Sequence, residues 1–488
     1  MTVRRGILVA GVAVFAIALV VLLTRRGSGT NPPSGGPTAT SSRPPPNVLI
    51  IVTDDQRWGG GSMAVMPKTR AWFKRGGVTF PQTFVSIPLC CPSRSTIFTG
   101  QYAHNHGVEV NGPLSAKQLN PESTVQRYLQ DDGYRTAIFG KYLNGWTADP
   151  PHFDEWATHQ GPKQRYYGGI WDVNGTPTKI TRYSTNYIEH KALSFLHRAK
   201  AHASRPWFLY LAPSAPHFPY VPSARYAHAS VPPWKGNPAV FESNRSDKPP
   251  YVRTRPPSTF QADLRTRREQ LRTQYSLDDL VGKVSHAIEK LGENRRTLAF
   301  FLSDNGYAWG EHGLLGTDLS KSTPYTPSIQ VPMFARWPGS LPAGSIDRRL
   351  VSTVDIAPTI LQAAGIRPDP QYPIDGRSLL DRSWRRRETL TEHWHILTVP
   401  GRHPAVPENA PGPKWATIRT RSYQYVEDYG RRGVVRFREY YDLRRDPWEL
   451  HNLLGDGNAA NNPNVSSLHH RLALDRRCRG TVGPTACP

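Results

Sequence analysis

The chain has 488 residues and a formal net charge of +23, from 61 Lys and Arg residues against 38 Asp and Glu residues. This length allows one large α/β domain and a smaller one, because single hydrophobic cores stop growing near about 250 to 300 residues. The charge indicates anionic partners, but no compact Lys/Arg run or RNA-binding signature accompanies it, which argues against nucleic acid.

The N-terminus predicts an export or anchoring segment over residues 1–26. Arg4 and Arg5 precede the apolar run GILVAGVAVFAIALVVLL, which is longer than a signal-peptide core and close to the length that spans a bilayer. No clear A-x-A cleavage site follows directly, which favours an uncleaved membrane anchor over the signal segment of a secreted form. Residues 27–45, rich in Gly, Pro and Ser, are predicted to be a linker. In both cases we expect the rest of the chain outside the cytoplasm.

Residues 46–384 alternate strand-like and helix-like segments, which predicts an α/β domain with a large, mainly parallel sheet sandwiched by helices. Four apolar runs each break into polar, Gly or Pro residues: PNVLIIVTDDQ, YRTAIFGKYLN, WFLYLAPSAPH and TLAFFLSDNG. Ligands of open α/β sheets bind beyond the carboxyl ends of the strands, so the polar residues there are candidates for a site. These residues are Asp54, Asp55, Lys141, His217, Asp304 and Asn305.

From residue 385 the pattern changes to strand alternation and a hairpin, in KWATIRTRSYQYVEDY and VVRFREYYDLRRDPWELHNLL. Residues 385–488 are therefore predicted to be a smaller α+β subdomain containing an antiparallel sheet. Outside the cytoplasm, its cysteines Cys478 and Cys487 could close a short disulfide loop. The tandem pair Cys90 and Cys91 is a poor disulfide candidate, because a bridge between neighbouring residues would be badly strained.

Oxygen-bearing side chains at two strand ends suggest a metal site. Asp54 with Asp55, and Asp304 with Asn305, offer carboxylate and amide oxygens that suit a hard divalent cation such as Ca²⁺ or Mg²⁺. Each pair alone is more often a turn or a helix cap. It is the occurrence of these pairs together with a strand-end lysine and histidine that favours a functional site.

The chain resembles the type I sulfatases of the alkaline-phosphatase-like superfamily, from about residue 46 to the segment YDLRRDPWELHNLL. CCPSRSTIFTG matches the family signature C-x-P-S-R-x-x-x-x-T-G with Cys90 in the leading position, and TDDQ, GKYLN, APHFP and SDNGYAWGEHG follow in the family's order. LCCPSR, HNHGV and GKYLN are most similar to the N-acetylglucosamine-6-sulfatase and heparan sulfate 6-O-sulfatase branch. Asn144, where many sulfatases carry a histidine, fits the same branch.

The resemblance implies that Cys90 is oxidised to Cα-formylglycine by a formylglycine-generating enzyme, whereas Cys91 occupies a variable position of the signature. The aldehyde hydrate would be the nucleophile, which divides a difficult hydrolysis into two easier steps. The implied cofactor is Ca²⁺ in preference to Mg²⁺. Its implied ligands are Asp54, Asp55, the hydrate oxygen at Cys90, Asp304 and Asn305.

The implied catalytic residues are Cys90, Arg94, Lys141, His217 and Lys321. Arg94 would steady the hydrate and a metal-ligand carboxylate, and the two lysines would hold sulfate oxygens. His217 would stand by the leaving oxygen, either as a proton donor or as a stabilising group. Lys321 departs from the family pattern, since Thr326 replaces an expected Glu, but it keeps its spacing to Tyr325.

Three further histidines and an aromatic stretch admit a simpler interpretation. Imidazole suits transition metals better than a hard, oxygen-lined site, so His104 and His106 are expected to buttress the helix after Arg94. His312, in GEHG, could contact substrate. The stretch RYYGGIWDVNG, residues 165–175, could stack on a sugar ring or pack as a hairpin.

Three functions fit the sequence. The first is a calcium-dependent, formylglycine-type sulfatase acting on a sulfated sugar or a glycosaminoglycan, whose polyanionic character suits the net charge. The second is a phosphonate monoester hydrolase or phosphodiesterase of the same superfamily. The third is a catalytically silent, membrane-tethered glycan-binding protein, and the complete set of Cys90, Arg94, Lys141 and His217 argues against it.

Overall fold

The computed structural model describes residues 44–159, 166–201, 204–316, 319–394 and 414–488. The predicted anchor, residues 1–26, and almost all of the predicted linker lie outside the described residues. Residues 45–488 form one compact unit. Within the described ranges, no helix combines the length and the apolar character needed to cross a membrane.

The main sheet has ten strands in the order β11-β2-β10-β9-β1-β8-β4-β5-β6-β7. Its central strands β9, β1, β8, β4 and β5 pair in parallel, whereas β10, β6 and β7 pair antiparallel towards the edges. This confirms the predicted large, mainly parallel sheet. In chain order the strands are β1 (Asn47–Thr53), β2 (Gly77–Thr79), β4 (Arg135–Gly140), β5 (Glu155–His159), β6 (Ile170–Val173), β7 (Thr176–Lys179), β8 (Trp207–Ala212), β9 (Thr297–Ser303), β10 (Met333–Arg336) and β11 (Ser345–Ile346).

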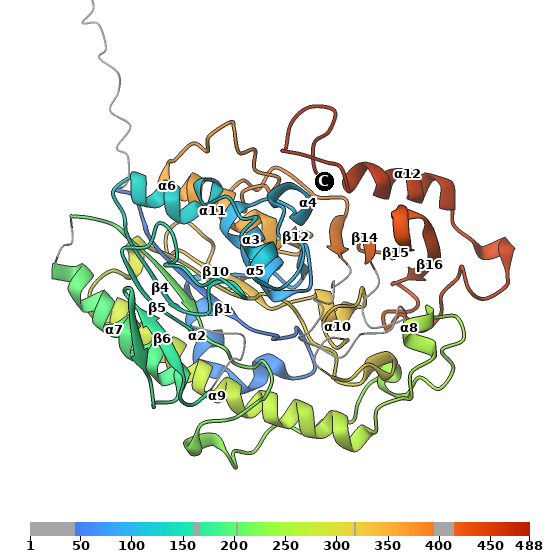
Figure 1. Cartoon of the computed structure of the whole chain (residues 1–488), viewed down its shortest axis with the longest axis horizontal. Coiled ribbons are helices and arrows are strands. Elements are labelled where there is room, and N and C mark those ends of the chain that lie inside the picture. Colours follow the sequence, from blue (N-terminus) through green and yellow to red (C-terminus); the bar gives the residue numbers. More distant parts are fainter. Residues whose placement is uncertain (1–43, 160–165, 202–203, 317–318, 395–413) are drawn as a thin grey trace, which may run out of the picture. The chain divides into compact units, whose positions relative to one another are not determined.

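Helices cover both faces of this sheet (Figure 1). Strand β1 is buried on both faces, and its successive side chains point in opposite directions. Leu49 and Ile51 pack with α2, α7 and α9, while Val48 and Ile50 pack with α3, α6 and α11. The helices are α2 (Pro67–Gly76), α3 (Cys90–Thr99), α4 (Ala103–His106), α5 (Pro113–Ala116), α6 (Val125–Asp131), α7 (Ser184–Ala201), α8 (Pro250–Arg253), α9 (Phe260–Lys290), α10 (Thr326–Ile329), α11 (Ile356–Ala364) and α12 (Val465–Asp475).

Helix α9, the 31-residue helix along one face of the sheet, shows why such a segment folds as it does. The Thr259 hydroxyl accepts a hydrogen bond from the Ala262 N–H at 3.2 Å and caps its first turn. Leu277, Val281 and Val284 recur at helical spacing and are buried against the sheet. The helix therefore packs an apolar stripe against the core of the sheet.

The C-terminal part contains the predicted antiparallel sheet, in the order β13-β14-β15-β16. Its strands are β13 (Thr389–His393), β14 (Lys414–Arg419), β15 (Tyr423–Tyr429) and β16 (Val435–Asp442). Two short strands, β3 (Thr83–Phe84) and β12 (Val351–Ser352), form a separate parallel pair. The predicted disulfide between Cys478 and Cys487 is confirmed. The proposed boundary between residues 46–384 and 385–488 stays a prediction.

Candidate active site

Four adjacent strands of the main sheet bring the predicted site residues to one edge. In the sheet, β9, β1, β8 and β4 are neighbours, and each is followed by polar residues. Asp304 follows β9, Asp54 follows β1, His217 lies in the loop after β8, and Lys141 follows β4. The carboxyl ends of parallel strands lie at the same edge, so the topology assembles this site from residues distant in sequence.

Backbone geometry fixes the turns that carry these side chains. Asp55 adopts a φ of 67°, and its N–H donates to Asp304 Oδ1 at 3.2 Å, which ties the two acidic turns together. Gly140 has a φ of 116°, and a Cβ there would lie 2.1 Å from the Ala212 carbonyl oxygen. Only glycine fits so close an approach of two strands, and it directs Lys141 into the site.

Cys90 is the first residue of α3 and is completely buried. Its Sγ lies 3.5 Å from Asp54 Oδ1, 3.7 Å from Asn305 Oδ1 and 3.4 Å from Lys321 Nζ. Burial raises the pKa of this thiol to about 12, so the unmodified side chain is a neutral thiol at pH 7. Cys91 instead packs in the hydrophobic core, so the two neighbouring cysteines have different environments.

Two lysines approach the acidic pair. Lys141 Nζ lies 2.7 Å from Asp54 Oδ2, and Lys321 Nζ lies 3.0 Å from Asp55 Oδ1. Burial alone would raise the pKa of Asp54, but Lys141 and other nearby cations hold it well below its ordinary range. Lys321 thus joins the site despite its departure from the family pattern.

Arg94 is fully buried and binds Asp304. Its Nε and Nη2 each lie 2.8 Å from Asp304 Oδ2, and its Nη1 donates to the Lys141 carbonyl at 3.1 Å. Burial and the neighbouring Asp54 raise the pKa of Asp304 to about 6, although Arg94 opposes this shift. Arg94 therefore connects α3 to the ends of β9 and β4.

The donor atoms of Asp54, Asp55, Cys90 and His217 all lie within 4.8 Å of one another, a grouping that could hold a metal ion. The predicted ligand set differs from this group, because it contains Asp304 and Asn305 and not His217. In the structure Asp304 pairs with Arg94, and Asn305 Nδ2 donates to Asp55 Oδ1 at 2.7 Å. Of this group, the two carboxylates are ligands that hard divalent cations prefer, whereas the thiol and the imidazole are not.

His217 is oriented by two hydrogen bonds. Its Nδ1 lies 2.7 Å from the Phe218 carbonyl oxygen, which only accepts, so Nδ1 carries the proton and Nε2 faces Asp55 Oδ2 at 3.7 Å. The Tyr166 hydroxyl donates to the His217 carbonyl at 2.7 Å. Burial lowers the pKa of His217, although Asp55 opposes the shift.

The other three histidines considered in the sequence contact side chains of the surrounding fold. His106 Nε2 lies 3.1 Å from Thr96 Oγ1 on α3, so it supports that helix as expected. His104 binds Glu392 of β13 at 2.6 Å rather than α3. His312 is buried, and its Nδ1 lies 2.8 Å from Glu242 Oε2.

In the aromatic stretch, β6 forms a hairpin with the following strand β7, and Trp171 is completely buried, which favours the packing interpretation. Sequence reasoning placed Tyr166 in this stretch but missed that it orients His217, and it missed Asn111, whose Oδ1 accepts the Cys91 N–H at 2.9 Å. It also missed the buried pair of Arg57 and Glu311 at 2.7 Å, directly after the acidic turn. The one sequence signal was the position of Arg57, two residues after Asp55.

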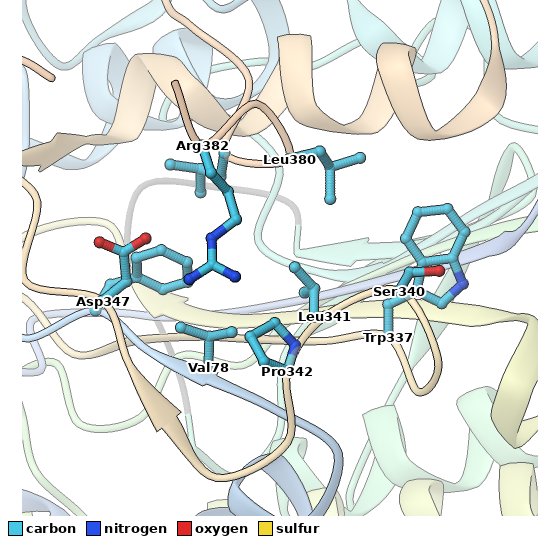
Figure 2. Close-up of a pocket in the computed structure, with 10 residues that line it drawn as sticks. Val78, Trp337, Ser340, Leu341, Pro342, Asp347, Leu380 and Arg382 are labelled. Carbon is cyan, nitrogen blue, oxygen red and sulfur yellow. The ribbon is translucent and has the colours of Figure 1, made fainter. Parts of the chain in front are cut away.

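A small pocket of about 180 Å³ lies elsewhere, at the β2 and β11 edge of the main sheet. Figure 2 shows it between apolar side chains such as Val78 and Leu341, with Asp347 and Arg382 beside them. Its lining contains no predicted site residue, so it has no part in the site described above.

Comparison with protein families decides the identity of the chain. The model described as sulfatase matches residues 46–366. The chain belongs to the sulfatase family. A second model, described as N-sulphoglucosamine sulphohydrolase, C-terminal, matches residues 310–477.

Named relatives agree with this sulfatase assignment. Human N-acetylglucosamine-6-sulfatase is 29% identical over 469 residues, which cover 86% of this chain and 82% of that protein. An extracellular sulfatase Sulf-1 homologue of Caenorhabditis elegans is 33% identical over 380 residues, covering 70% of this chain and 51% of that protein. For the Drosophila melanogaster homologue, the aligned region covers 31% of that protein. The chain thus spans about half of the first of these extracellular sulfatases and about a third of the second, and all three relatives are named sulfatases.

Solved structures show the same alkaline-phosphatase-like fold. A protein solved in complex with its substrate D-glucosamine-2-N,6-O-disulfate has a TM-score of 0.73 and 21% identity, covering 88% of this chain and 97% of that chain. The phosphonate monoester hydrolase of Silicibacter pomeroyi has a TM-score of 0.67 and 23% identity, covering 88% of this chain and 95% of that chain. At these identities the likeness establishes the fold and leaves the reaction open.

Proposed function

We propose that this sulfatase is a calcium-dependent, formylglycine-type enzyme that hydrolyses sulfate esters of a sulfated sugar or a glycosaminoglycan-like glycan. The observation that carries this proposal is the position of Cys90, whose Sγ lies among Asp54, Asn305 and Lys321 at the start of α3. A neutral, buried thiol is a poor nucleophile, which supports the conversion of this residue by a formylglycine-generating enzyme. The hydrate would supply one hydroxyl as nucleophile and a second whose deprotonation releases the sulfate.

The proposed ligands of Ca²⁺ are Asp54, Asp55, Asp304, Asn305 and the hydrate oxygen at position 90. The residues fit a hard cation, because the carboxylates of Asp54 and Asp55 lie beside the nucleophile and the hydrate would replace the thiol sulfur by an oxygen ligand. We favour Ca²⁺ over Mg²⁺. When bound, the ion would neutralise sulfate charge and orient the ester.

Side chains of the protein would bind the sulfate, position the metal ligands and interact with the leaving group. Lys141 and Lys321 would bind sulfate oxygens where negative charge concentrates, since the Lys321 ammonium faces the nucleophile and the Lys141 ammonium binds the neighbouring Asp54. Arg94 would hold Asp304 in place. His217 would donate the Nε2 proton of its imidazolium form to the leaving oxygen, or stabilise that oxygen through it, while the Nδ1 proton stays bonded to the Phe218 carbonyl.

The test is a comparison of kcat/KM for matched nitrophenyl sulfate, phosphate and phosphonate esters, together with a 6-sulfated N-acetylglucosamine. The proposal predicts the highest value for a sulfate ester, loss of activity in Cys90→Ala and retained activity in Cys91→Ala. Treatment with a chelator should abolish turnover, and added Ca²⁺ should restore it. A phosphate or phosphonate ester as the best substrate would contradict the proposal.

A second candidate function is phosphonate monoester hydrolysis or phosphodiester hydrolysis. The structural likeness to the Silicibacter pomeroyi phosphonate monoester hydrolase favours it, since that chain is matched over 95% of its length. The same nucleophile and cations would serve a tetrahedral phosphorus centre equally well.

We also propose that the protein works outside the cytoplasm, either anchored through residues 1–26 or secreted. The disulfide between Cys478 and Cys487 supports an oxidising compartment, and two relatives are named extracellular sulfatases. We further propose that residues 46–384 are the catalytic domain and that residues 385–488 are a supporting subdomain.

A further inference from the structure

The segment that carries Lys321 has little regular structure of its own. Residues 321–325 form bends and turns, and α10 begins only at Thr326. The whole stretch from Ser320 to Tyr325 is nevertheless buried. Buried backbone groups outside regular elements need hydrogen-bond partners from elsewhere in the protein.

Some partners lie in neighbouring turns, and four come from the C-terminal part of the chain. The Trp415 indole N–H donates to the Ser322 carbonyl at 3.1 Å, and Gln424 Nε2 donates to the Pro324 carbonyl at 3.0 Å. The next two contacts continue along the segment: the Tyr325 hydroxyl donates to Glu439 Oε2 at 2.9 Å, and the Thr326 N–H donates to Glu449 Oε2 at 2.9 Å. Strands β14, β15 and β16 each provide one of these side chains.

Glu449 lies in the motif RDPWELHNLL, which the proposed reaction does not otherwise use. It adopts a φ of 59°, an uncommon conformation for a residue other than glycine. Its second oxygen, Oε1, binds Arg419 Nη1 of β14 at 3.0 Å, and both side chains are buried. Residues other than glycine in such an uncommon backbone conformation often lie at functional sites. Here the buried ion pair with Arg419 holds Glu449 in place.

We propose that Trp415, Glu439 and Glu449 are positioning residues for Lys321. They hold the 322–326 segment, and through it they keep the Lys321 ammonium on Asp55 and on the nucleophile at position 90. A lysine has four rotatable side-chain bonds, so its placement near a reacting sulfate depends on how firmly its backbone is fixed. The four-stranded sheet thus contributes to catalysis without contacting the substrate.

This inference rests on the proposed sulfatase function and is tested by mutant cycles. Tyr325→Phe and Trp415→Phe each remove one contact to the segment. Tyr429→Phe and Trp384→Phe are matched controls, because they remove a comparable tyrosine–glutamate contact at 2.8 Å and a comparable indole–carbonyl contact at 2.7 Å elsewhere. Each variant is made in the wild-type protein and in Lys321→Met.

In the wild-type background we expect Tyr325→Phe and Trp415→Phe to lower kcat/KM for an aryl sulfate about tenfold. The controls should stay within about twofold of wild type. In the Lys321→Met background the same two variants should cause no further loss, because the lysine on which they act is gone. Equal losses in both backgrounds would overturn the proposal, since they would indicate a general structural defect.

Hydrogen exchange gives a readout that does not depend on turnover. Tyr325→Phe and Trp415→Phe should speed amide exchange in the peptide covering residues 319–330, whereas the controls should not. Unchanged exchange would also overturn the proposal. If the wild-type protein fails to cleave sulfate esters, the proposed function fails, and the exchange experiment still decides the positioning role. If Trp415→Phe does not fold, Tyr325→Phe, which removes a single hydroxyl, decides alone.

Discussion

Lys141 follows β4, and its ammonium forms an ion pair with Asp54 at 2.7 Å, beside the nucleophile. If it holds sulfate oxygens in the transition state, Lys141→Ala should lower kcat about 10²- to 10³-fold, the usual cost of losing one such donor. The measurement is steady-state turnover of nitrophenyl sulfate, with circular dichroism to show retained fold. Lys283→Ala, which removes a largely exposed lysine paired with Glu189, is the control and should leave kcat unchanged. A similar loss in both variants would contradict the assigned role.

His217 has a role that depends on the leaving group. A sugar alkoxide needs a proton as it leaves, whereas nitrophenolate leaves readily without one. His217→Ala should therefore lower kcat/KM for a 6-sulfated sugar about 10²- to 10⁴-fold and reduce turnover of nitrophenyl sulfate much less. Parallel assays of both substrates test this. Equal losses on the two substrates would assign His217 to binding or orientation rather than to the leaving oxygen.

Single residues differ in how well the sequence predicts them. Asp54, Lys141 and Asp304 were predictable because each follows an apolar strand run, and Cys90 leads a signature specific to a family. The partnership of Arg57 with Glu311 was not, because a buried ion pair between residues 254 positions apart leaves no local pattern. The contact between Tyr325 and Glu439 was not predictable either, because it also joins residues that are distant in the sequence.

The turn that precedes α11 is held by one acidic residue. Asp355 accepts hydrogen bonds from the Ser352 and Arg377 N–H groups, both at 2.9 Å, and is bound by both terminal nitrogens of Arg386. All three of these partners reach a carboxylate that is completely buried. The turn that leads into α11 therefore depends on one fully compensated charge.

Removal of the Arg386 side chain should lower the stability of the folded protein. Arg386→Met would leave Asp355 buried without its counter-charge and should lower the free energy of unfolding by about 3–5 kcal/mol. Urea denaturation measures this change. Arg445→Met, which breaks a long contact at an exposed residue, is the control and should have no measurable effect. A loss of activity per folded molecule in Arg386→Met would show that α11 also serves the site.

At the level of elements, the sequence predicted the buried strands and the C-terminal hairpin, because both follow from hydrophobic periodicity. It did not predict the order of the strands or the antiparallel edge formed by β6 and β7. Strand order depends on pairings between distant segments, such as β1 with β8 and β9, that periodicity does not encode.

Contacts between residues distant in sequence also join the C-terminal sheet and the disulfide loop to the part of the molecule that carries the candidate site. His104, on α4, binds Glu392 of β13 at 2.6 Å and the Cys478 carbonyl at 3.0 Å. Burial alone would lower the pKa of His104, but Glu392, the Cys478 carbonyl and Asp375 together outweigh it and raise this pKa to about 9. The charged histidine thus stabilises the folded protein.

The sign of this effect predicts its pH dependence. A folded-state pKa above the unfolded value of about 6.5 gives stability that is fully present below that pH and is lost as the pH rises through about 9. His104→Gln should therefore lower unfolding free energy by at most roughly 3 kcal/mol near pH 6, and by almost nothing near pH 10. Urea midpoints across this range test the prediction. An effect of His104→Gln that is independent of pH would contradict it.

We propose that Cys90, and not Cys91, is converted to formylglycine and acts as the nucleophile. Peptide mass spectrometry of the fragment containing both residues, from protein purified out of its native host and assayed for sulfate ester hydrolysis, would detect this conversion. In active protein we expect a mass loss equal to the replacement of a thiol by an aldehyde, located at Cys90. Two unmodified thiols in fully active protein would overturn the proposed mechanism.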